Sequence, residues 1–187
     1  MNVIDFLKLN LRNKMKVAQG NHVSIDASAK IRGCKIIVKG RNNHLRIAKG
    51  CNLRNVHIEI LGNNCSITID EGCVIGENCY LSSREEGTRL ALGADCMLSR
   101  NVKLMTSDGH DILKAGQRVN FAKDITLGCS VWLADNVTVL KGVTIGEGSI
   151  VGINSTLTKS IANNEVAAGS PAKVVASDMS WHEALTF

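Results

Sequence analysis

The chain has 187 residues and a formal net charge of +5; 44% of the residues are hydrophobic, 21% charged and 3% aromatic. This length and balance fit one globular domain and exclude a disordered or wholly membrane-embedded chain. The modest positive charge suits an anionic small ligand or an acidic substrate, and no run of like charges calls for nucleic acid.

Residues 1–16 predict a short helix, because Ile4, Leu7 and Leu11 recur at helical spacing and basic residues occupy the remaining surface. The apolar part is too short and too interrupted to span a bilayer. We expect this helix to cap one end of the domain, and contact with a membrane surface is the second interpretation. No secretory signal is evident, so we expect a cytoplasmic protein with at most peripheral membrane contact.

Residues 17–162 follow a repeating pattern that is clearest from residue 127 onward. There the chain reads LGCSVW, LADNVT, VLKGVT, IGEGSI, VGINST and LTKSIA, with an aliphatic residue at the first place of each step. Hexapeptide steps of this kind indicate very short strands between turns and predict an all-β solenoid, a parallel β-helix. Three steps make a coil of 18 residues, which predicts that Leu127 stacks on Ile145 and Leu133 on Val151.

The earlier coils carry the same frame with longer turns. The positions expected on one edge are Val23, Leu45, Ile67, Leu90 and Ile125. Their separations are 22, 22, 23 and 35 residues, so the last gap leaves 17 residues beyond one coil. We therefore predict an insertion over about residues 104–123, and long excursions from a solenoid are more often functional than structural.

Most of the seven cysteines fall at the inward, small-residue place of the repeat. These residues are Cys51, Cys65, Cys73, Cys79 and Cys96. Cysteine is compact and often buried, so we interpret them as packed thiols of a reduced protein rather than as disulfides or metal ligands.

The coils are expected to end near Ala162. Residues 163–187 then predict an extended segment followed by a helix at SWHEAL, where Ser180 and Glu183 suit a capping box.

The run from LGCSVW to LTKS, followed by AAGSPAKVV and preceded by TSDGH, resembles the hexapeptide-repeat acyltransferases. The TSDGH stretch is similar to the catalytic loop of sugar O-acetyltransferases of capsule, exopolysaccharide and O-antigen synthesis. The resemblance covers roughly residues 20–175. It implies a left-handed parallel β-helix that uses acetyl-CoA and no metal, acts on a sugar or polysaccharide, and assembles as a homotrimer with sites between subunits.

His110 is the candidate general base, since a sugar hydroxyl is a poor nucleophile and an imidazole titrates near neutral pH. The other four histidines fall at repeat turns, within a coil or near the C-terminus, whereas His110 lies in the insertion. Asp108 and Asp111 are the nearby carboxylates that would orient the imidazole or accept a sugar hydroxyl. Arg118, also in the insertion, is expected to help close the site.

The resemblance also implies where coenzyme A lies. Main-chain groups of two successive turns would hold its pantetheine arm, and Trp132 would flank the thioester. The residues matched to coenzyme A contacts are Ala134, Asp135, Gly152, Ile153, Thr158, Lys159, Pro171 and Lys173.

Three alternatives accompany this interpretation. The acceptor would be an amine if the chain acts on an amino sugar or on serine, although serine acetyltransferases carry a large N-terminal helical domain. A γ-type carbonic anhydrase needs three imidazoles on zinc, and the relevant region has one. A non-catalytic β-helix scaffold has no need of the His110 insertion.

Overall fold

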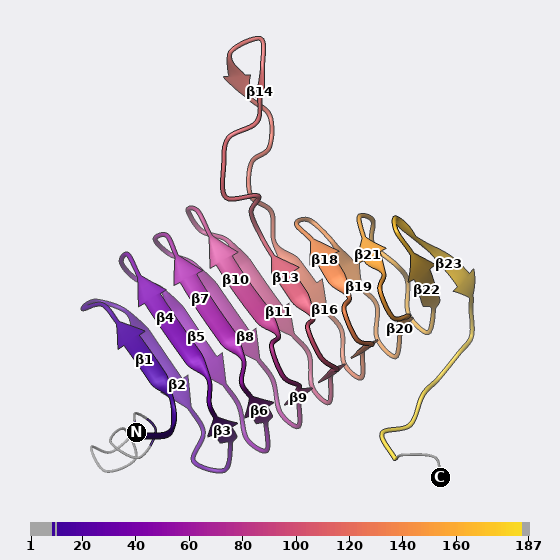
Figure 1. The fold of residues 1–187 in the computed structure, drawn as a ribbon, viewed down its shortest axis with the longest axis horizontal. Helices are drawn as coiled ribbons and strands as arrows, with labels where there is room; N and C mark the ends of the chain where they lie inside the picture. The colour runs from indigo at the N-terminus through magenta and orange to yellow at the C-terminus, as the bar shows by residue number, and fades with distance from the viewer. Residues whose placement is uncertain (1–8, 10, 185–187) are drawn as a thin grey trace.

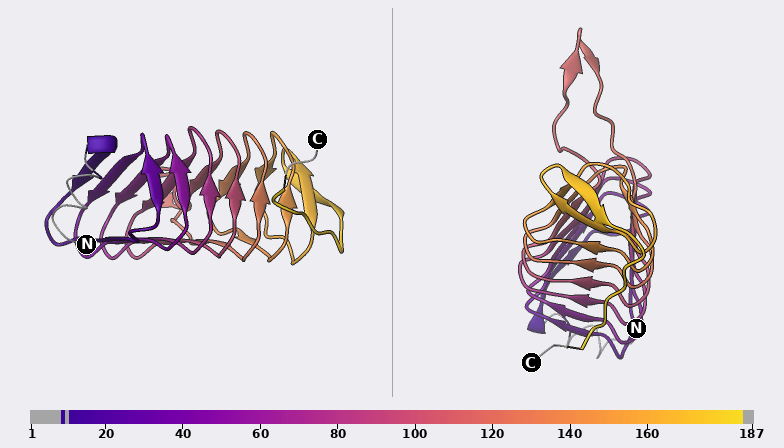
Figure 2. Two further views of the ribbon diagram at one scale, coloured as in Figure 1. Left: turned by 90° about the horizontal axis from the view of Figure 1, so that it is seen from below. Right: turned by 90° about the vertical axis from the view of Figure 1, so that its right-hand side faces the viewer.

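The computed structural model describes Leu9 and residues 11–184. These residues form an all-β solenoid whose coils stack side by side along one axis, and successive strands pass to different sheets (Figure 1). Seen along that axis, the coils superimpose into a closed outline from which one hairpin projects (Figure 2). The expectation of a parallel β-solenoid is confirmed.

Three sheets form the walls of the solenoid, and we name them sheets A, B and C. Sheet A contains, in order, β1 (Lys14–Val17), β4 (Lys35–Lys39), β7 (His57–Leu61), β10 (Tyr80–Arg84), β13 (Lys103–Met105), β18 (Thr138–Leu140) and β21 (Thr156–Leu157). Sheet B contains β2 (His22–Ile25), β5 (His44–Ile47), β8 (Ser66–Ile69), β11 (Arg89–Leu92), β16 (Ile125–Leu127) and β19 (Thr144–Ile145). Sheet C contains β3 (Lys30–Arg32), β6 (Asn52–Arg54), β9 (Val74–Ile75), β12 (Met97–Leu98), β17 (Trp132–Leu133), β20 (Ile150–Val151), β22 (Val166–Gly169) and β23 (Ala172–Ala176).

The register of the coils is the one that the repeat predicts. Leu127 pairs with Ile145 and Leu133 with Val151 in parallel strands. The edge expected in the earlier coils is also continuous, because each of its residues pairs with the next.

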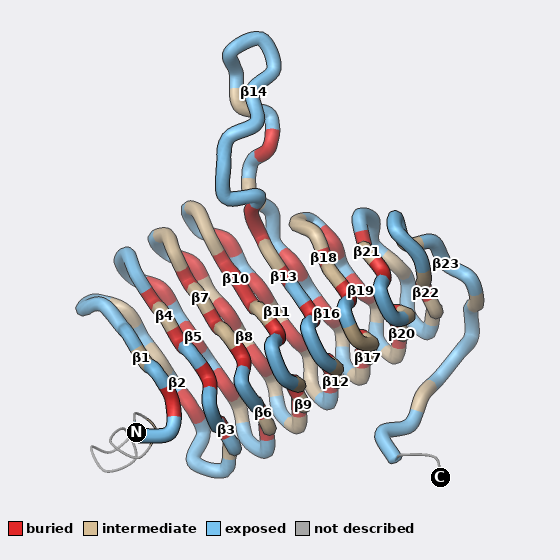
Figure 3. The backbone as a smooth tube through the Cα atoms, viewed as in Figure 1, coloured by how far each residue is buried: buried red, intermediate tan, exposed pale blue. Residues whose placement is uncertain are grey.

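Buried residues recur in every coil along the solenoid (Figure 3), and most of them are aliphatic. Alternate residues of each strand point inward, and Ile36, Ile58 and Leu81 on neighbouring strands of sheet A are 0% exposed. Burying one such side chain contributes about 1.5–3 kcal/mol. Each coil covers the apolar face of the next, so stacking creates the core.

The inward cysteines are packed thiols, as expected. All five predicted positions, and Cys34 in addition, are buried, whereas Cys129 is exposed. Thiols point across to the next coil: Cys73 Sγ donates to the Gly93 carbonyl over 3.1 Å and Cys79 Sγ to the Ser99 carbonyl over 3.2 Å. Burial raises the pKa of the Cys79 thiol to about 11, which keeps it protonated.

Asparagines shape the corner between sheets C and A. Asn101, Asn136 and Asn154 have φ of 58°, 62° and 58°, a left-handed conformation that asparagine tolerates. Their side chains form a ladder: Asn101 Nδ2 donates to Asn136 Oδ1 over 3.0 Å, and Asn136 Nδ2 donates to Asn154 Oδ1 over 2.9 Å.

The two predicted helices are not supported. Most of residues 1–16 lies outside the described residues; Leu9, Leu11 and Arg12 are helical, but the chain already enters β1 at Lys14 and pairs there with β4. The predicted C-terminal helix is wrong in its described part, which contains bends and no helix from Ser180 to Ala184.

A tryptophan contact accounts for the C-terminal conformation. Trp181 Nε1 donates to the Ser130 carbonyl over 2.6 Å, and its ring centroid lies 5.8 Å from that of Trp132. This docking holds the segment against the coils in a non-helical conformation. In the described part of the chain, no helix has the length and apolar character needed to span a membrane.

One hairpin interrupts the coils, and we call residues 107–122 the arm. It leaves sheet A after β13 and contains the antiparallel pair β14 (Leu113–Lys114) and β15 (Gln117–Arg118). Figure 1 shows the arm projecting from the stack of coils. The Lys123 N–H donates to the Thr106 carbonyl over 3.0 Å, so the arm begins and ends at one point of the coil.

Candidate active site

Thr106 anchors the root of the arm. It is buried, and its Oγ1 accepts a hydrogen bond of 3.0 Å from the Arg84 N–H of the preceding coil. The chain therefore leaves the solenoid from a fixed point. The next residues, Ser107 to His110, complete the TSDGH stretch just outside the coils.

Glu85 holds both sides of the arm. Its carboxylate accepts hydrogen bonds of 2.6 Å from Ser107 Oγ and 2.6 Å from Arg118 Nη2. Burial by itself raises the pKa of Glu85, but the bonds from Arg118 and Ser107 outweigh it, so the net shift is downward and the group stays ionised. Arg118 Nε also lies 3.0 Å from Asp111 Oδ1, and its guanidinium stacks on Phe121.

Lys141 ties the arm to the following coil. Its Nζ forms an ion pair with Asp108 Oδ2 and donates to the Asn120 carbonyl over 2.8 Å. The hydrogen bond from Lys141 is the largest influence on Asp108, whose pKa is lowered despite partial burial.

Asn120 fixes the main chain at His110. It is buried, and its Nδ2 donates to the His110 carbonyl and to Asp108 Oδ2, each over 2.8 Å. Its Oδ1 accepts from the Ile112 N–H over 2.7 Å. One side chain thus joins the two sides of the arm around the histidine.

Gly109 gives the chain its sharp turn before His110. Its φ is +82°, where a side chain would be strained, and its N–H donates to Ser107 Oγ over 3.1 Å. The His110 side chain is exposed beyond this turn. Neither Asp108 nor Asp111 is hydrogen-bonded to the imidazole, because Lys141 and Arg118 engage them.

The residues matched to coenzyme A lie on different parts of the solenoid. Ala134 and Asp135 follow β17 and Gly152 and Ile153 follow β20, so both turns lie at the corner between sheets C and A. At the first turn, the Asp135 carboxylate is bound by Arg100, with Nη2 at 2.7 Å.

The second part of the set lies elsewhere. Thr158 and Lys159 are exposed after β21, at the corner between sheets A and B where the arm also leaves. Pro171 follows a cis peptide bond and Lys173 is exposed, both in the β22–β23 hairpin.

Trp132 is half-buried on sheet C, and its Nε1 donates to Ser99 Oγ over 3.2 Å. Its sheet is not the one from which the arm leaves. The single chain therefore distributes the predicted site residues over several edges, and the arm and the C–A corner do not form one pocket.

Four residues that hold the arm could not be identified from the sequence: Arg84, Glu85, Asn120 and Lys141. Glu85 and Lys141 come from coils on either side of the insertion, 22 residues from Ser107 and 33 from Asp108. No local motif marks such contacts. Only the aligned register of the turns brings them together.

The arrangement suits proton transfer at an exposed imidazole held on a braced main chain. The Gly109–His110 segment is fixed by Ser107 and Asn120 while the ring faces outward, where an acceptor has access. A base placed in this way needs only a hydroxyl within hydrogen-bond reach.

Known proteins resemble this chain in sequence, and a solved structure resembles it in fold. No family-wide sequence profile matches the chain. The chain is 35% identical over 94 residues to the polysialic acid O-acetyltransferase of Escherichia coli O1:K1 / APEC, which is 49% of this chain and 31% of the relative. It is 34% identical over 107 residues to the galactoside O-acetyltransferase of Escherichia coli K12, or 54% of this chain and 52% of the relative. The crystallographic structure of the polysialic acid O-acetyltransferase OatWY superimposes with a TM-score of 0.70 and 29% identity over 93% of this chain and 92% of that one.

The chain is thus similar in sequence to known sugar O-acetyltransferases and in fold to a solved polysialic acid O-acetyltransferase. This hexapeptide-repeat protein spans about half or less of the length of the two curated relatives, although it covers nearly all of the OatWY structure.

Proposed function

We propose that this hexapeptide-repeat protein transfers an acetyl group from acetyl-CoA to a hydroxyl of a sugar or polysaccharide precursor. The observation that carries the proposal is the braced position of His110, on an arm fixed by Asn120, Glu85 and Lys141. The names of its relatives, polysialic acid and galactoside O-acetyltransferases, support a sugar acceptor.

The proposed reaction needs one base and no metal ion. The His110 imidazole takes the proton of the acceptor hydroxyl as the oxygen attacks the thioester carbonyl carbon. The tetrahedral intermediate expels the thiolate of coenzyme A, and the imidazolium returns the proton to that sulfur. A main-chain N–H of a coil turn stabilises the oxyanion. The products are an acetyl ester and free coenzyme A.

The donor side of the site is assigned by the resemblance. Main-chain groups at Ala134–Asp135 and Gly152–Ile153 hold the pantetheine chain of coenzyme A, and Trp132 lies beside the thioester. Thr158, Lys159, Pro171 and Lys173 serve the nucleotide end, where lysine ammonium groups meet phosphates.

The separation of these residues supports a site shared between subunits. We assign the protein a homotrimeric assembly of left-handed coils acting in the cytoplasm, with the arm of one subunit closing on the C–A corner of the next. The exposure of Ile112, Leu113, Val119 and Phe121, at 56%, 60%, 54% and 60%, is consistent with an arm that packs on a neighbour. Residues 17–162 then form the acyltransferase unit, and residues 163–187 an extension that closes its end.

The first test replaces the proposed base. His110→Ala is expected to lower kcat by about 10²–10⁴-fold, because general base catalysis contributes that much. The measurement is release of free coenzyme A with a panel of oligosaccharide acceptors, and mass spectrometry of the product.

His44→Ala is the matched control. His44 is exposed like His110 but stacks on His22 at 4.9 Å in an early coil. Its removal is expected to leave kcat unchanged. Full turnover in His110→Ala would remove this residue as the base. A product stable to hydroxylamine would identify an amide and so an amine acceptor.

A further inference from the structure

The basic residues of the chain are concentrated in its first coils. Residues 11–60 contain 11 Lys and Arg against 2 Asp and Glu, whereas residues 61–187 contain 10 against 14. The positive net charge of the protein therefore originates at the N-terminal end of the solenoid, several coils away from the arm.

Three arginines occupy equivalent places in successive coils. The Gly33 N–H bonds to the Arg12 carbonyl and the Asn55 N–H to the Arg32 carbonyl, and Arg32 pairs with Arg54 across β3 and β6. We call Arg12, Arg32 and Arg54 the arginine ladder. It follows the corner between sheets C and A, with steps of about 4.8 Å between coils.

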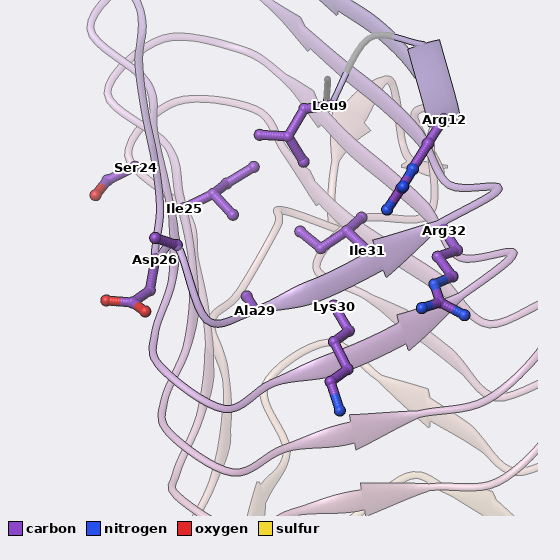
Figure 4. A pocket seen from close by; sticks show the side chains of 10 residues that line it. Leu9, Arg12, Ser24, Ile25, Asp26, Ala29, Lys30, Ile31 and Arg32 are labelled. Atoms are coloured by element: carbon purple, nitrogen blue, oxygen red, sulfur yellow. The ribbon is translucent and has the colours of Figure 1, made fainter. Parts of the chain in front are cut away.

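Two lysines flank this ladder on the adjacent edge of sheet A. Lys14 pairs directly with Lys35 in strands β1 and β4. All five side chains are exposed. Figure 4 shows Arg12 and Arg32 near one another at the carboxyl end of β3, beside a hollow that both residues line.

No ion pair within the described part of the chain neutralises the ladder. None of its arginines, nor Lys14 or Lys35, takes part in an ion pair there. The two acidic residues of the same coils are engaged elsewhere, since Asp26 accepts from Ser28 and Glu59 pairs with Arg84.

The corner between sheets B and C shows that neutralisation is attainable in this fold. Arg46 pairs with Asp70 at 2.6 Å and Lys49 with Glu71 at 2.9 Å, each across one coil step. Like charges placed directly opposite one another destabilise a sheet. The Arg32–Arg54 and Lys14–Lys35 pairs therefore carry a cost that an external anion would relieve.

We propose that the arginine ladder, with Lys14 and Lys35, is a docking surface for a linear anionic polysaccharide. Its three arginines follow one another along the solenoid axis at main-chain steps comparable with one sugar residue of an extended chain, and guanidinium binds carboxylate through paired hydrogen bonds. A row along a ridge fits a chain that carries one carboxylate on each sugar.

An anionic membrane is the competing partner, and the surface favours it less. Membrane-surface segments combine basic residues with exposed apolar anchors. The large exposed apolar side chains of the described residues lie mainly on the arm and the β23 region, and only Leu11 and Val17 lie in the first coil beside the ladder.

The test measures binding of full-length protein to polygalacturonate oligosaccharide in the absence of any acetyl donor. Its outcome is therefore independent of His110 and of the proposed activity. Arg32→Gln combined with Arg54→Gln is expected to weaken binding about 10-fold at low ionic strength, and added salt should weaken wild-type binding.

The matched control is Arg41→Gln combined with Arg89→Gln, which removes the same charge from two exposed arginines outside the ladder. This control is expected to stay within about 2-fold of the wild type. The thermal midpoint of the ladder variant should be no lower than that of the wild type at low salt, since a like-charge pair has been removed.

Three results would overturn the proposal. The first is wild-type binding to polygalacturonate no tighter than to neutral dextran. The second is an equal loss of binding in the control and the ladder variants, which would indicate net charge alone. Ladder-dependent binding to phosphatidylserine vesicles but not to the polysaccharide would assign the surface to a membrane.

Discussion

Asn120 connects three parts of the arm through one buried side-chain amide. It bonds to Asp108, to the His110 carbonyl and to the Ile112 N–H. Removing a buried partner leaves groups without hydrogen bonds, at about 1–3 kcal/mol each. That free energy concerns the arm, because Asn120 packs outside the stacked core.

Asn120→Ala is therefore expected to lower kcat by about 10–100-fold while the thermal midpoint of the solenoid stays nearly constant. Steady-state kinetics and a melting curve on the same preparation measure both. Gln117→Ala, an exposed change in the arm's hairpin, is the control and should leave both values unchanged. A loss of midpoint equal to that of a core variant would contradict the positioning role.

At the same scale, the sequence predicts the inward residues better than the contacts of the site. Cys65 and Ile67 follow from the hexapeptide frame because each coil repeats the same inward positions. The partners of Asp108 do not follow, because an insertion has no frame. Its position in the sequence suggests that Asp108 orients the His110 imidazole. In the structure, Asp108 is bound by Lys141 and Asn120 instead.

The arm as an element is held by carboxylates, which makes its attachment sensitive to acid. The pKa of Asp108 is lowered, first by the hydrogen bond from Lys141, so the folded arm favours the ionised form. A group with a lowered pKa contributes stability above its unfolded pKa, about 3.9 for aspartate. That contribution is lost as the pH falls through the lower folded value.

Hydrogen exchange of the Val119 and Ile112 amides should accordingly accelerate as the pH is lowered below about 4, after correction for intrinsic rates. In Lys141→Met the amides are expected to exchange faster already at neutral pH and to depend less on pH. Lys123→Met, at the other end of the arm, is the control. Equal protection in wild type and Lys141→Met would show that Lys141 does not hold the arm.

The strands were predicted correctly where the sequence repeats with a fixed period. The coils and their pairing follow from six-residue steps, as the Leu127–Ile145 pair shows. The C-terminal helix failed because a local capping pattern at Ser180 competes with a distant contact, the docking of Trp181 on Trp132. Local patterns carry no information on such contacts.

At the scale of the whole molecule, the exposed apolar arm argues for assembly. Leu113→Asp combined with Val119→Asp is expected to convert the proposed trimer into monomers, because burying two carboxylates in an interface is unfavourable. Sedimentation equilibrium measures the state. Val175→Asp, at a residue 63% exposed outside the arm, is the control and should sediment like the wild type. A wild-type monomer would refute the shared site.

The concentration of basic residues in the first coils has a consequence for how the molecule moves. With an excess of cations in residues 11–60 and of anions in residues 61–187, the elongated solenoid carries an electric dipole along its axis. In the field of a polyanion it will rotate before contact, so that its N-terminal end arrives first. Approach would then be directional, and it would become random as salt shortens the screening length.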